Sequence, residues 1–305
     1  MSVQRRIRVI GAPMDLGASR RGVDMGPFSV RVAGLVPRLR ELGHTVIDDG
    51  NVRVEVREQN DPGNPRLRYL AQIVPVCEEL FDRVYKAASE GDVTITIGGD
   101  HSIVIGSLAG VSLAYQEKGQ KLGLLWFDAH GDFNTPETTS SGNIHGMPFA
   151  ASLGYGAQEL TRIGFPGAKF DAARCCLIGG RDLDLEERRN MRSAGIKVYT
   201  MRDIDERGMP TIMREALAIV LDGTSGVAVS LDMDGMDPAW APGVGTPVKG
   251  GLSYREAHLA MEMVADTGKL VHLDMVEINP LLDTTNATSE RGVELALSAL
   301  GKTIY

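Results

Sequence analysis

The sequence contains few cysteines, and their number and placement exclude two kinds of site. Cys77, Cys175 and Cys176 are the only three in a chain of 305 residues. An odd number in a chain of this size argues against a disulfide framework. The adjacent pair lies inside an apolar run, which argues against a thiolate metal site. We expect all three to be reduced core residues in a reducing compartment.

Long apolar runs are also missing. No run approaches the roughly 18 uninterrupted apolar residues that a membrane-spanning helix needs. The N-terminal segment 1–13 holds arginines and then only a short apolar run, without the apolar centre and cleavage site of a secretory signal. The sequence therefore predicts a cytoplasmic protein that does not associate with a membrane.

Positive charge is in the minority. The chain has 32 Lys and Arg against 40 Asp and Glu, so its formal net charge is −8. Clustered Lys and Arg give affinity for nucleic acid by releasing counterions, and no basic stripe is present, so we expect no nucleic-acid partner. The 43% apolar content and the even spread of charge exclude disorder.

Short runs rich in Val, Ile and Leu alternate with segments of helical periodicity. The apolar runs predict strands near 6–11, 45–49, 93–98, 122–127, 175–179, 196–199, 226–231 and 270–277. The periodic segments predict helices near 27–42, 67–90, 102–118, 185–194, 209–222, 253–266 and 287–300. This alternation predicts an α/β fold, a parallel sheet with helices on both faces, formed by residues 1–305 as one domain. The stretch 132–167, rich in Gly, Ser, Thr and Pro, is interpreted as a functional loop region.

Polar clusters follow three of the predicted strands: GGDHS at 98–102, DAHGD at 128–132 and DMDGMD at 232–237. Ligands of open parallel sheets bind at the carboxyl ends of the strands, so we expect these clusters to meet in one crevice. Alternate residues of an extended segment share a face. Asp128, His130 and Asp132 are therefore expected to point together, as are Asp232 and Asp234.

With His101, these side chains make a set of four carboxylates and two imidazoles. Four ionised aspartates would repel one another unless cations compensate them, and two divalent metals carry the matching charge. Oxygen donors with a minority of imidazole suit Mn(II). One such cluster alone is typical of a turn or a helix cap, whereas three clusters at neighbouring strand ends favour a two-metal site that activates water.

Two further residues are candidates for chemistry. His145 lies 13 residues after Asp132, in a Gly-rich loop that is expected to fold over the crevice. It is interpreted as a proton shuttle, although a lone histidine in such a loop is usually a surface residue. Glu277 ends the last predicted strand and is either a salt-bridged core acid or the partner of a cationic substrate. Structural roles are expected for His44, His258 and His272.

These motifs closely resemble those of the arginases, of the ureohydrolase family, particularly the bacterial enzymes. The resemblance extends essentially end to end. It includes GASRRGVDMGP at 17–27, GGDHS at 98–102, DAHGDFNTPET at 128–138, SGNIHGMP at 141–148, SLDMDGMDP at 230–238, APGVGTP at 241–247, GGLSYREAH at 250–258 and EINP at 277–280. It implies a three-layer αβα fold with a mostly parallel eight-stranded sheet. It also implies hydrolysis of L-arginine to L-ornithine and urea by a hydroxide that bridges two Mn(II) ions per subunit.

The resemblance also implies a role for individual residues. One metal would be held by His101, Asp128, Asp132 and Asp232, and the other by Asp128, His130, Asp232 and Asp234. Asp132 would orient the hydroxide, His145 would relay protons, and Glu277 would pair with the guanidinium group. The loop after residue 132 follows the arginase pattern rather than that of agmatinases. The implied substrate contacts are Asn134, Thr139, Ser141, Asn143, Asp182, Asp184, Glu187, Thr246 and Glu277.

Two other functions remain as alternatives: an agmatinase or another guanidino-compound hydrolase, and a catalytically silent binding protein of the same fold. The complete set of six metal ligands argues against the silent protein. Phe133 is bulkier than the residue of many relatives and is expected at the rim of the pocket. Arg255 and Glu256 match positions used in contacts between subunits, so the resemblance implies a homo-oligomer, a trimer or a hexamer.

Overall fold

The computed structural model describes residues 4–304 and contains one eight-stranded sheet. The strands are Arg6–Ala12 (β1), Thr45–Asn51 (β2), Val93–Gly98 (β3), Leu122–Phe127 (β4), Cys175–Gly180 (β5), Lys197–Thr200 (β6), Gly226–Asp232 (β7) and Leu270–Val276 (β8). Their order is β2-β1-β3-β8-β7-β4-β5-β6, and every pair is parallel. The α/β prediction is confirmed, and the sheet is wholly rather than mostly parallel.

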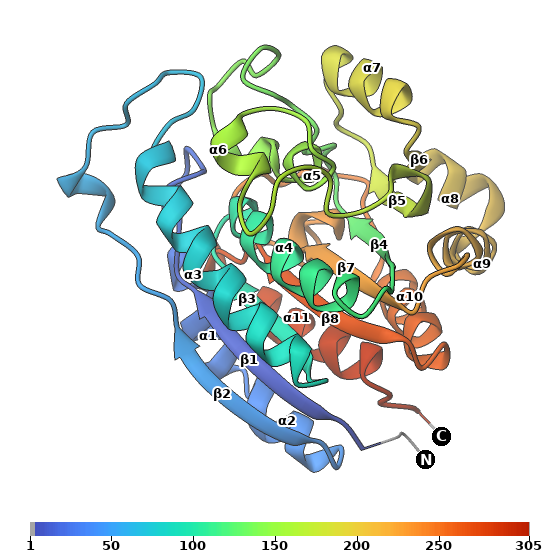
Figure 1. Ribbon diagram of the computed structural model, residues 1–305. Helices are drawn as coiled ribbons and strands as arrows, with labels where there is room; N and C mark the ends of the chain where they lie inside the picture. Colours follow the sequence, from blue (N-terminus) through green and yellow to red (C-terminus); the bar gives the residue numbers. More distant parts are fainter. Residues whose placement is uncertain (1–3, 305) are drawn as a thin grey trace.

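Helices cover both faces of the sheet and make three layers (Figure 1). One face packs against α3 (Leu70–Ser89), α4 (Val104–Gln116), α5 (Pro148–Ser152), α6 (Gln158–Thr161) and α7 (Leu185–Ala194). The other packs against α1 (Gly26–Val32), α2 (Leu35–Glu41), α8 (Met201–Arg207), α9 (Met209–Val220), α10 (Tyr254–Asp266) and α11 (Ala287–Ala299). Strands β3, β4 and β7 are buried at every position, which explains their nearly continuous apolar sequences.

All eight strands were predicted, but the helices differ in three places. The segment 27–42 forms two helices because Gly34 between them has φ 88°, a left-handed conformation that a right-handed helix cannot contain. Helix α8 was not predicted, although Thr200 and Asp203 form a capping box at its start. The stretch 132–167 is not only a loop, since it holds a 3-10 turn at Ile144–Gly146 together with α5 and α6.

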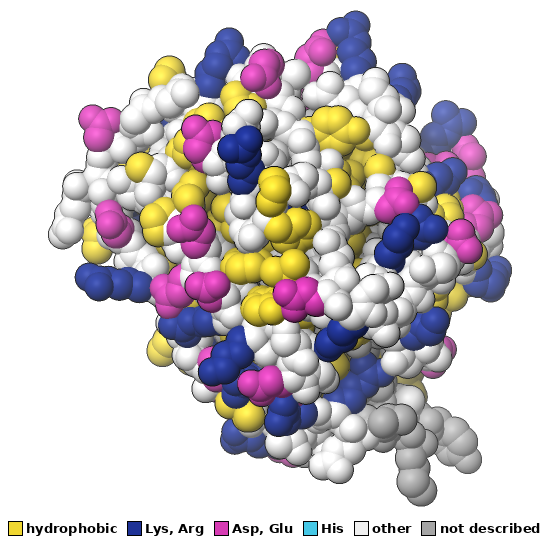
Figure 2. Space-filling model, viewed as in Figure 1, with side chains coloured by type: hydrophobic (Ala, Val, Ile, Leu, Met, Phe, Trp, Pro, Cys, Tyr) yellow, Lys and Arg dark blue, Asp and Glu magenta, His cyan; other side chains and the backbone are white. Residues whose placement is uncertain are grey.

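The state of the cysteines and the distribution of surface charge match what the composition predicts. The three cysteines are free and buried. None of the helices formed by residues 4–304 has both the length and the apolar character needed to cross a lipid bilayer. On the face drawn in Figure 2, Lys and Arg side chains are interspersed with Asp and Glu side chains.

Candidate active site

The predicted polar clusters meet at the carboxyl ends of β3, β8, β7 and β4, which are adjacent in the sheet. His101 begins a 3-10 turn after β3, Asp128 follows β4, and Asp232 ends β7. The sequence predicted three ligand-bearing strands as neighbours, but β8 lies between β3 and β7. This strand brings Glu277 to the same edge of the sheet.

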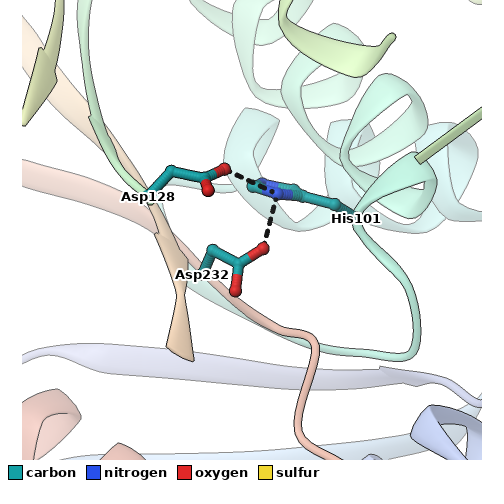
Figure 3. A group of neighbouring side chains, drawn as sticks. All are labelled: His101, Asp128 and Asp232. Atoms are coloured by element: carbon teal, nitrogen blue, oxygen red, sulfur yellow. Dashed lines mark ion pairs between the residues drawn. The ribbon is translucent and has the colours of Figure 1, made fainter. Parts of the chain in front are cut away.

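His101 is the centre of one group of possible metal ligands. Its Nδ1 lies 3.3 Å from Asp128 Oδ2 and 3.0 Å from Asp232 Oδ2, and both carboxylates point at the ring (Figure 3). Asp132 Oδ2 lies 2.9 Å from the same nitrogen. All four side chains are buried. A single nitrogen carries at most one proton, so three converging carboxylates resemble ligands arranged around an ion more than a hydrogen-bonded cluster.

His130 is the centre of a second group. Its Nδ1 lies 3.4 Å from Asp128 Oδ1 and 3.1 Å from Asp234 Oδ2. Asp128 belongs to both groups, with one carboxylate oxygen toward each imidazole. Asp232 belongs to the first group alone. The geometry thus suits Asp128 as a bridge between two ions and places Asp232 nearer to one of them.

Tight turns, rather than an extended backbone, bring these carboxylates together. The Asp128 carboxylate accepts a hydrogen bond from the His130 N–H at 2.7 Å, and that of Asp232 accepts one from the Asp234 N–H at 2.8 Å. Asp132 has φ 48°, which is uncommon for a residue other than glycine. The side chains therefore meet as expected, but the reason given for it was wrong. Tight turns bring them together, and not the shared face of an extended segment.

Two residues that were not predicted from the sequence, Trp126 and Ser230, contact the possible metal ligands. Trp126 Nε1 donates a hydrogen bond to Asp128 Oδ2 at 2.9 Å, and Ser230 Oγ lies 2.8 Å from His101 Nε2. A partner on the second ring nitrogen fixes the tautomer and the orientation of a ligating histidine. Trp126 and Ser230 each lie two residues before an aspartate at the end of a strand. That spacing was visible in the sequence, because alternate strand residues share a face.

Without metal, the close carboxylates and imidazoles shift one another's proton affinity. Burial by itself would lower the pKa of His101, but the carboxylates of Asp132 and Asp128 raise it well above its usual value. Burial, with repulsion from Asp128, raises the pKa of Asp132 to about 6. Burial and repulsion from neighbouring aspartates likewise raise the pKa of Asp232. The metal-free site therefore holds protons that a metal ion would displace on binding.

The buried Glu277 pairs with the partly exposed His145 beside the first group. Glu277 Oε1 lies 3.0 Å from His145 Nδ1 and accepts a hydrogen bond from the His101 N–H at 2.9 Å. Although burial opposes the shift, this pairing raises the pKa of His145 to about 9 and lowers the pKa of Glu277. Glu277 also has φ 62°, a strained backbone conformation of the kind that clusters at functional sites. Its Oε2 is buried without a hydrogen-bond partner, which leaves an acceptor for a cationic group.

A cavity of about 270 Å³ opens above the two groups. All the predicted substrate contacts except Glu277 line it, namely Asn134, Thr139, Ser141, Asn143, Asp182, Asp184, Glu187 and Thr246. Ser140 and Gly146 line it as well and were not predicted. Among the described residues, the lining includes several acids but neither Lys nor Arg. The cavity therefore suits a ligand that carries positive charge.

Hydrogen bonds hold the cavity wall in place. Asn134 Nδ2 donates to Asp184 Oδ2 at 3.2 Å, and Thr246 Oγ1 donates to Asp234 Oδ2 at 2.8 Å. The Glu187 carboxylate accepts from the N–H groups of Phe133 and Asp184, each at 3.1 Å. Burial raises the pKa of Glu187 to about 7. Through the bond from Thr246 to Asp234, the wall of the cavity is connected to the second group of possible metal ligands.

Phe133 does not lie at the rim, contrary to the expectation. Its side chain is 1% exposed and packs edge-on against Phe149, with ring centroids 5.6 Å apart, and near Tyr155. Its ring therefore belongs to the core below the cavity, and only its backbone N–H reaches Glu187.

The three histidines for which structural roles are expected lie outside the cavity lining. His44, His258 and His272 pair with Leu300 O, Ser298 Oγ and Thr94 Oγ1.

Comparison with known proteins gives consistent matches along the chain. The sequence model of the Arginase family matches residues 5–301. The arginase of Bacillus caldovelox is 48% identical over 297 residues, which are 97% of this chain and 98% of that protein. The arginase of Bacillus subtilis (strain 168) is 46% identical over 300 residues, covering 98% and 99% of the two chains. The solved structure of the arginase from Bacillus caldovelox superposes with a TM-score of 0.95, covering 99% of this chain and 100% of that one at 46% identity.

Proposed function

The chain belongs to the arginase family, and we propose that its central site hydrolyses L-arginine to L-ornithine and urea with two Mn(II) ions per subunit. One observation carries this proposal. Two groups of carboxylates and imidazoles are joined by Asp128, and four of their members, His130, Asp132, Asp232 and Asp234, line a cavity rich in acids. Such a cavity receives a linear cationic substrate and places its guanidinium end near the metal ligands.

The donor set fits two manganese ions. Carboxylate oxygens outnumber imidazole nitrogens, which suits a hard divalent cation such as Mn(II). The buried Nδ1 of His101 also lacks a hydrogen bond of good geometry, and an ion would satisfy it. We assign one ion to His101, Asp128, Asp132 and Asp232, and the other to Asp128, His130 and Asp234; Asp232, which the resemblance implies for both ions, lies nearer to the first. Bound ions would neutralise the carboxylates and lower the pKa of a water molecule.

The protein's own groups orient the substrate and move its protons. The free Oε2 of Glu277 accepts a hydrogen bond from the guanidinium group. The Asp132 carboxylate orients the attacking water. His145 lies in the cavity lining with its Nδ1 held by Glu277, so its other nitrogen can pass a proton to the departing amine.

The mouth of the cavity recognises the α-amino-acid end of the substrate. Asp182, Asp184 and Glu187 provide negative charge for the α-ammonium group. The loop 134–143 provides hydroxyl and amide groups for the α-carboxylate, directly or through water. Its conformation is held by local hydrogen bonds, such as that from the Gly142 N–H to Thr139 Oγ1 at 3.0 Å. Thr246 lines the cavity while it also holds Asp234.

Urea release from arginine and from agmatine tests this function directly. We expect the Mn-loaded protein to have a kcat/KM for arginine at least about 100-fold above that for agmatine, because agmatine leaves the carboxylate-binding groups unpaired. Dialysis against a chelator should remove the activity, and added Mn(II) should restore it. Equal or better kcat/KM on agmatine would instead favour the agmatinase. Absence of urea from either compound in the presence of Mn(II) would favour the silent binding protein.

We also propose a homo-oligomer, a trimer or a hexamer. Arg255 lies on the surface of α10, 3.3 Å from Glu262, and is half-exposed. Glu256 is less available for a subunit contact than the sequence implied, because its carboxylate accepts the Ser253 N–H in a capping box. A monomer mass in light scattering at assay concentrations would overturn the oligomer.

Residues 1–305 are proposed to form one domain, since strands from Arg6 to Val276 belong to one sheet. A cytoplasmic location and the lack of a nucleic-acid or membrane partner are also proposed, on the grounds of composition. Separate unfolding transitions in calorimetry would contradict the single domain.

A further inference from the structure

Arg181, directly after β5, binds several backbone carbonyls close to the metal ligands. Its guanidinium group donates hydrogen bonds to five carbonyl oxygens, and it forms no ion pair with a carboxylate within the described residues. The acceptors and distances are Gly179 O (3.2 Å), Asp234 O (2.7 Å), Gly235 O (3.1 Å), Met236 O (3.2 Å) and Val248 O (2.8 Å). One side chain therefore joins the end of β5, the 3-10 turn Met233–Gly235 and the loop at 246–248.

The backbone of the same residue holds a second ligand loop. The N–H groups of Arg181 and Asp182 both donate to Ala129 O, at 2.8 and 2.9 Å. Ala129 lies between Asp128 and His130. Arg181 therefore contacts both segments that carry the His130 group, which we define as Asp128, His130 and Asp234.

The third segment extends this bracing to a ligand side chain. Val248 O accepts from the guanidinium group, and Thr246, two residues earlier, donates to Asp234 Oδ2 at 2.8 Å. The carboxylate of Asp234 is thus held through Thr246 while its backbone carbonyl is held directly by Arg181. A shift of this carboxylate would change its distance from His130 Nδ1, now 3.1 Å.

The contacts require an arginine at this position. A guanidinium group has five N–H donors in a rigid plane, whereas the ammonium group of lysine has three donors on a flexible stem. Gly251 makes room for the plane, because a Cβ there would lie 2.5 Å from Arg181 Nη2. Burial lowers the pKa of Arg181, and the nearby carboxylates of Asp234 and Asp128 oppose that shift.

We propose that Arg181 is a positioning residue that keeps the His130 group in the geometry required for binding one of the two metal ions. This inference rests on the proposed function, because it assumes that the two groups bind a pair of ions. It predicts an unequal effect on the two ions. The His101 group consists of His101, Asp128, Asp132 and Asp232 and shares only Asp128 with the His130 group. Among the described residues, Arg181 makes no hydrogen bond to His101, Asp132 or Asp232.

Mn(II) titration of the metal-free full chain, in the absence of arginine, tests the inference with Arg181→Met. We expect wild type to bind two ions. The variant should bind one ion with near wild-type affinity and the other at least about 10-fold more weakly, because loss of a residue that holds metal ligands in place commonly lowers metal affinity by that factor. Its EPR spectrum should change from that of a coupled pair to that of an isolated Mn(II), as in His130→Asn. Turnover should recover when Mn(II) is saturating, because affinity and not chemistry is altered.

Arg5→Met is the matched control, since Arg5 is also a partly buried guanidinium that donates to two carbonyls, Leu270 O at 2.6 Å and Gly268 O at 2.7 Å, far from the cavity lining. It should bind both ions as wild type does. Arg181→Lys should lie between wild type and Arg181→Met, and it replaces that variant if circular dichroism shows Arg181→Met unfolded. Unchanged affinity for both ions, or equal weakening of both, would overturn the inference. A wild-type chain that binds no Mn(II) would instead defeat the proposed function.

Discussion

Asp232→Ala is expected to lose Mn(II) at one or both positions and to lower kcat for arginine by at least about 1000-fold. The Asp232 carboxylate is 3% exposed and lies 3.0 Å from His101 Nδ1. The substitution removes a negatively charged ligand from a buried site, and the remaining imidazoles and carboxylates have no other group there to replace it. A loss of about 4 kcal/mol in transition-state stabilisation corresponds to that fall in rate. Metal analysis of the dialysed protein and the rate of urea release provide the two measurements.

Asp128→Ala should have at least as large an effect, because Asp128 belongs to both ligand groups. His145→Asn is the control for both variants. His145 lies in the cavity lining but pairs with Glu277 rather than with a ligand carboxylate, so this variant should keep both ions and lose turnover by roughly 100-fold. Loss of metal from His145→Asn, or two retained ions in Asp232→Ala, would contradict the separate roles given to these residues.

The local pattern of the sequence was sufficient to predict the strands and to bring the proposed metal ligands to one edge of the sheet, for a physical reason. A strand buried on both faces must be apolar along its whole length, as β4 is, and the first polar residue after it marks the carboxyl end. Ligand positions such as Asp128 and Asp232 coincide with those ends. The residues proposed to bind metal were therefore also the easiest to recognise in the sequence.

The parts that were missed depend on tertiary contacts. The position of β8 between β3 and β7 follows from the packing of distant segments, and no local pattern records it. Arg181 binds backbone carbonyls, which have no side-chain signature in the sequence. Phe133 was misplaced because its neighbour Asp132 has a positive φ, which turns the chain so that the aromatic ring enters the core.

Glu277→Gln is expected to lower kcat/KM for arginine by about 150- to 5000-fold. Glu277 is 1% exposed, and its unpartnered Oε2 is the acceptor proposed for the guanidinium group. Loss of one member of a buried charge pair costs about 3 to 5 kcal/mol, because the remaining charge is left uncompensated. Glu294→Gln is the matched control for kinetics, since Glu294 is a partly buried glutamate of α11 that pairs with Arg291 and does not line the cavity.

The same variant should change the proton affinity of His145. The carboxylate of Glu277 stabilises the imidazolium form and raises the pKa of His145 to about 9, whereas burial favours the neutral form. A neutral Gln removes the first effect, while burial and the attraction of Asp132 and Asp100 remain, so the pKa of His145 should fall from about 9 toward the ordinary value of about 6.5. NMR titration of the metal-free protein measures it, and Glu294→Gln should leave it unchanged.

The same charge pair should make the free energy of unfolding depend on pH. Because the folded-state pKa of His145 is raised, the pair stabilises the fold fully below about pH 6.5 and loses that contribution as the pH rises through about 9. The metal-free Glu277→Gln variant should therefore unfold at lower denaturant concentration than wild type at pH 6, and the difference should narrow or vanish at pH 10. A pKa of His145 that stays near 9 in the variant, or a stability difference independent of pH, would show that Glu277 does not hold the imidazolium. His145 would then need another source of its charge.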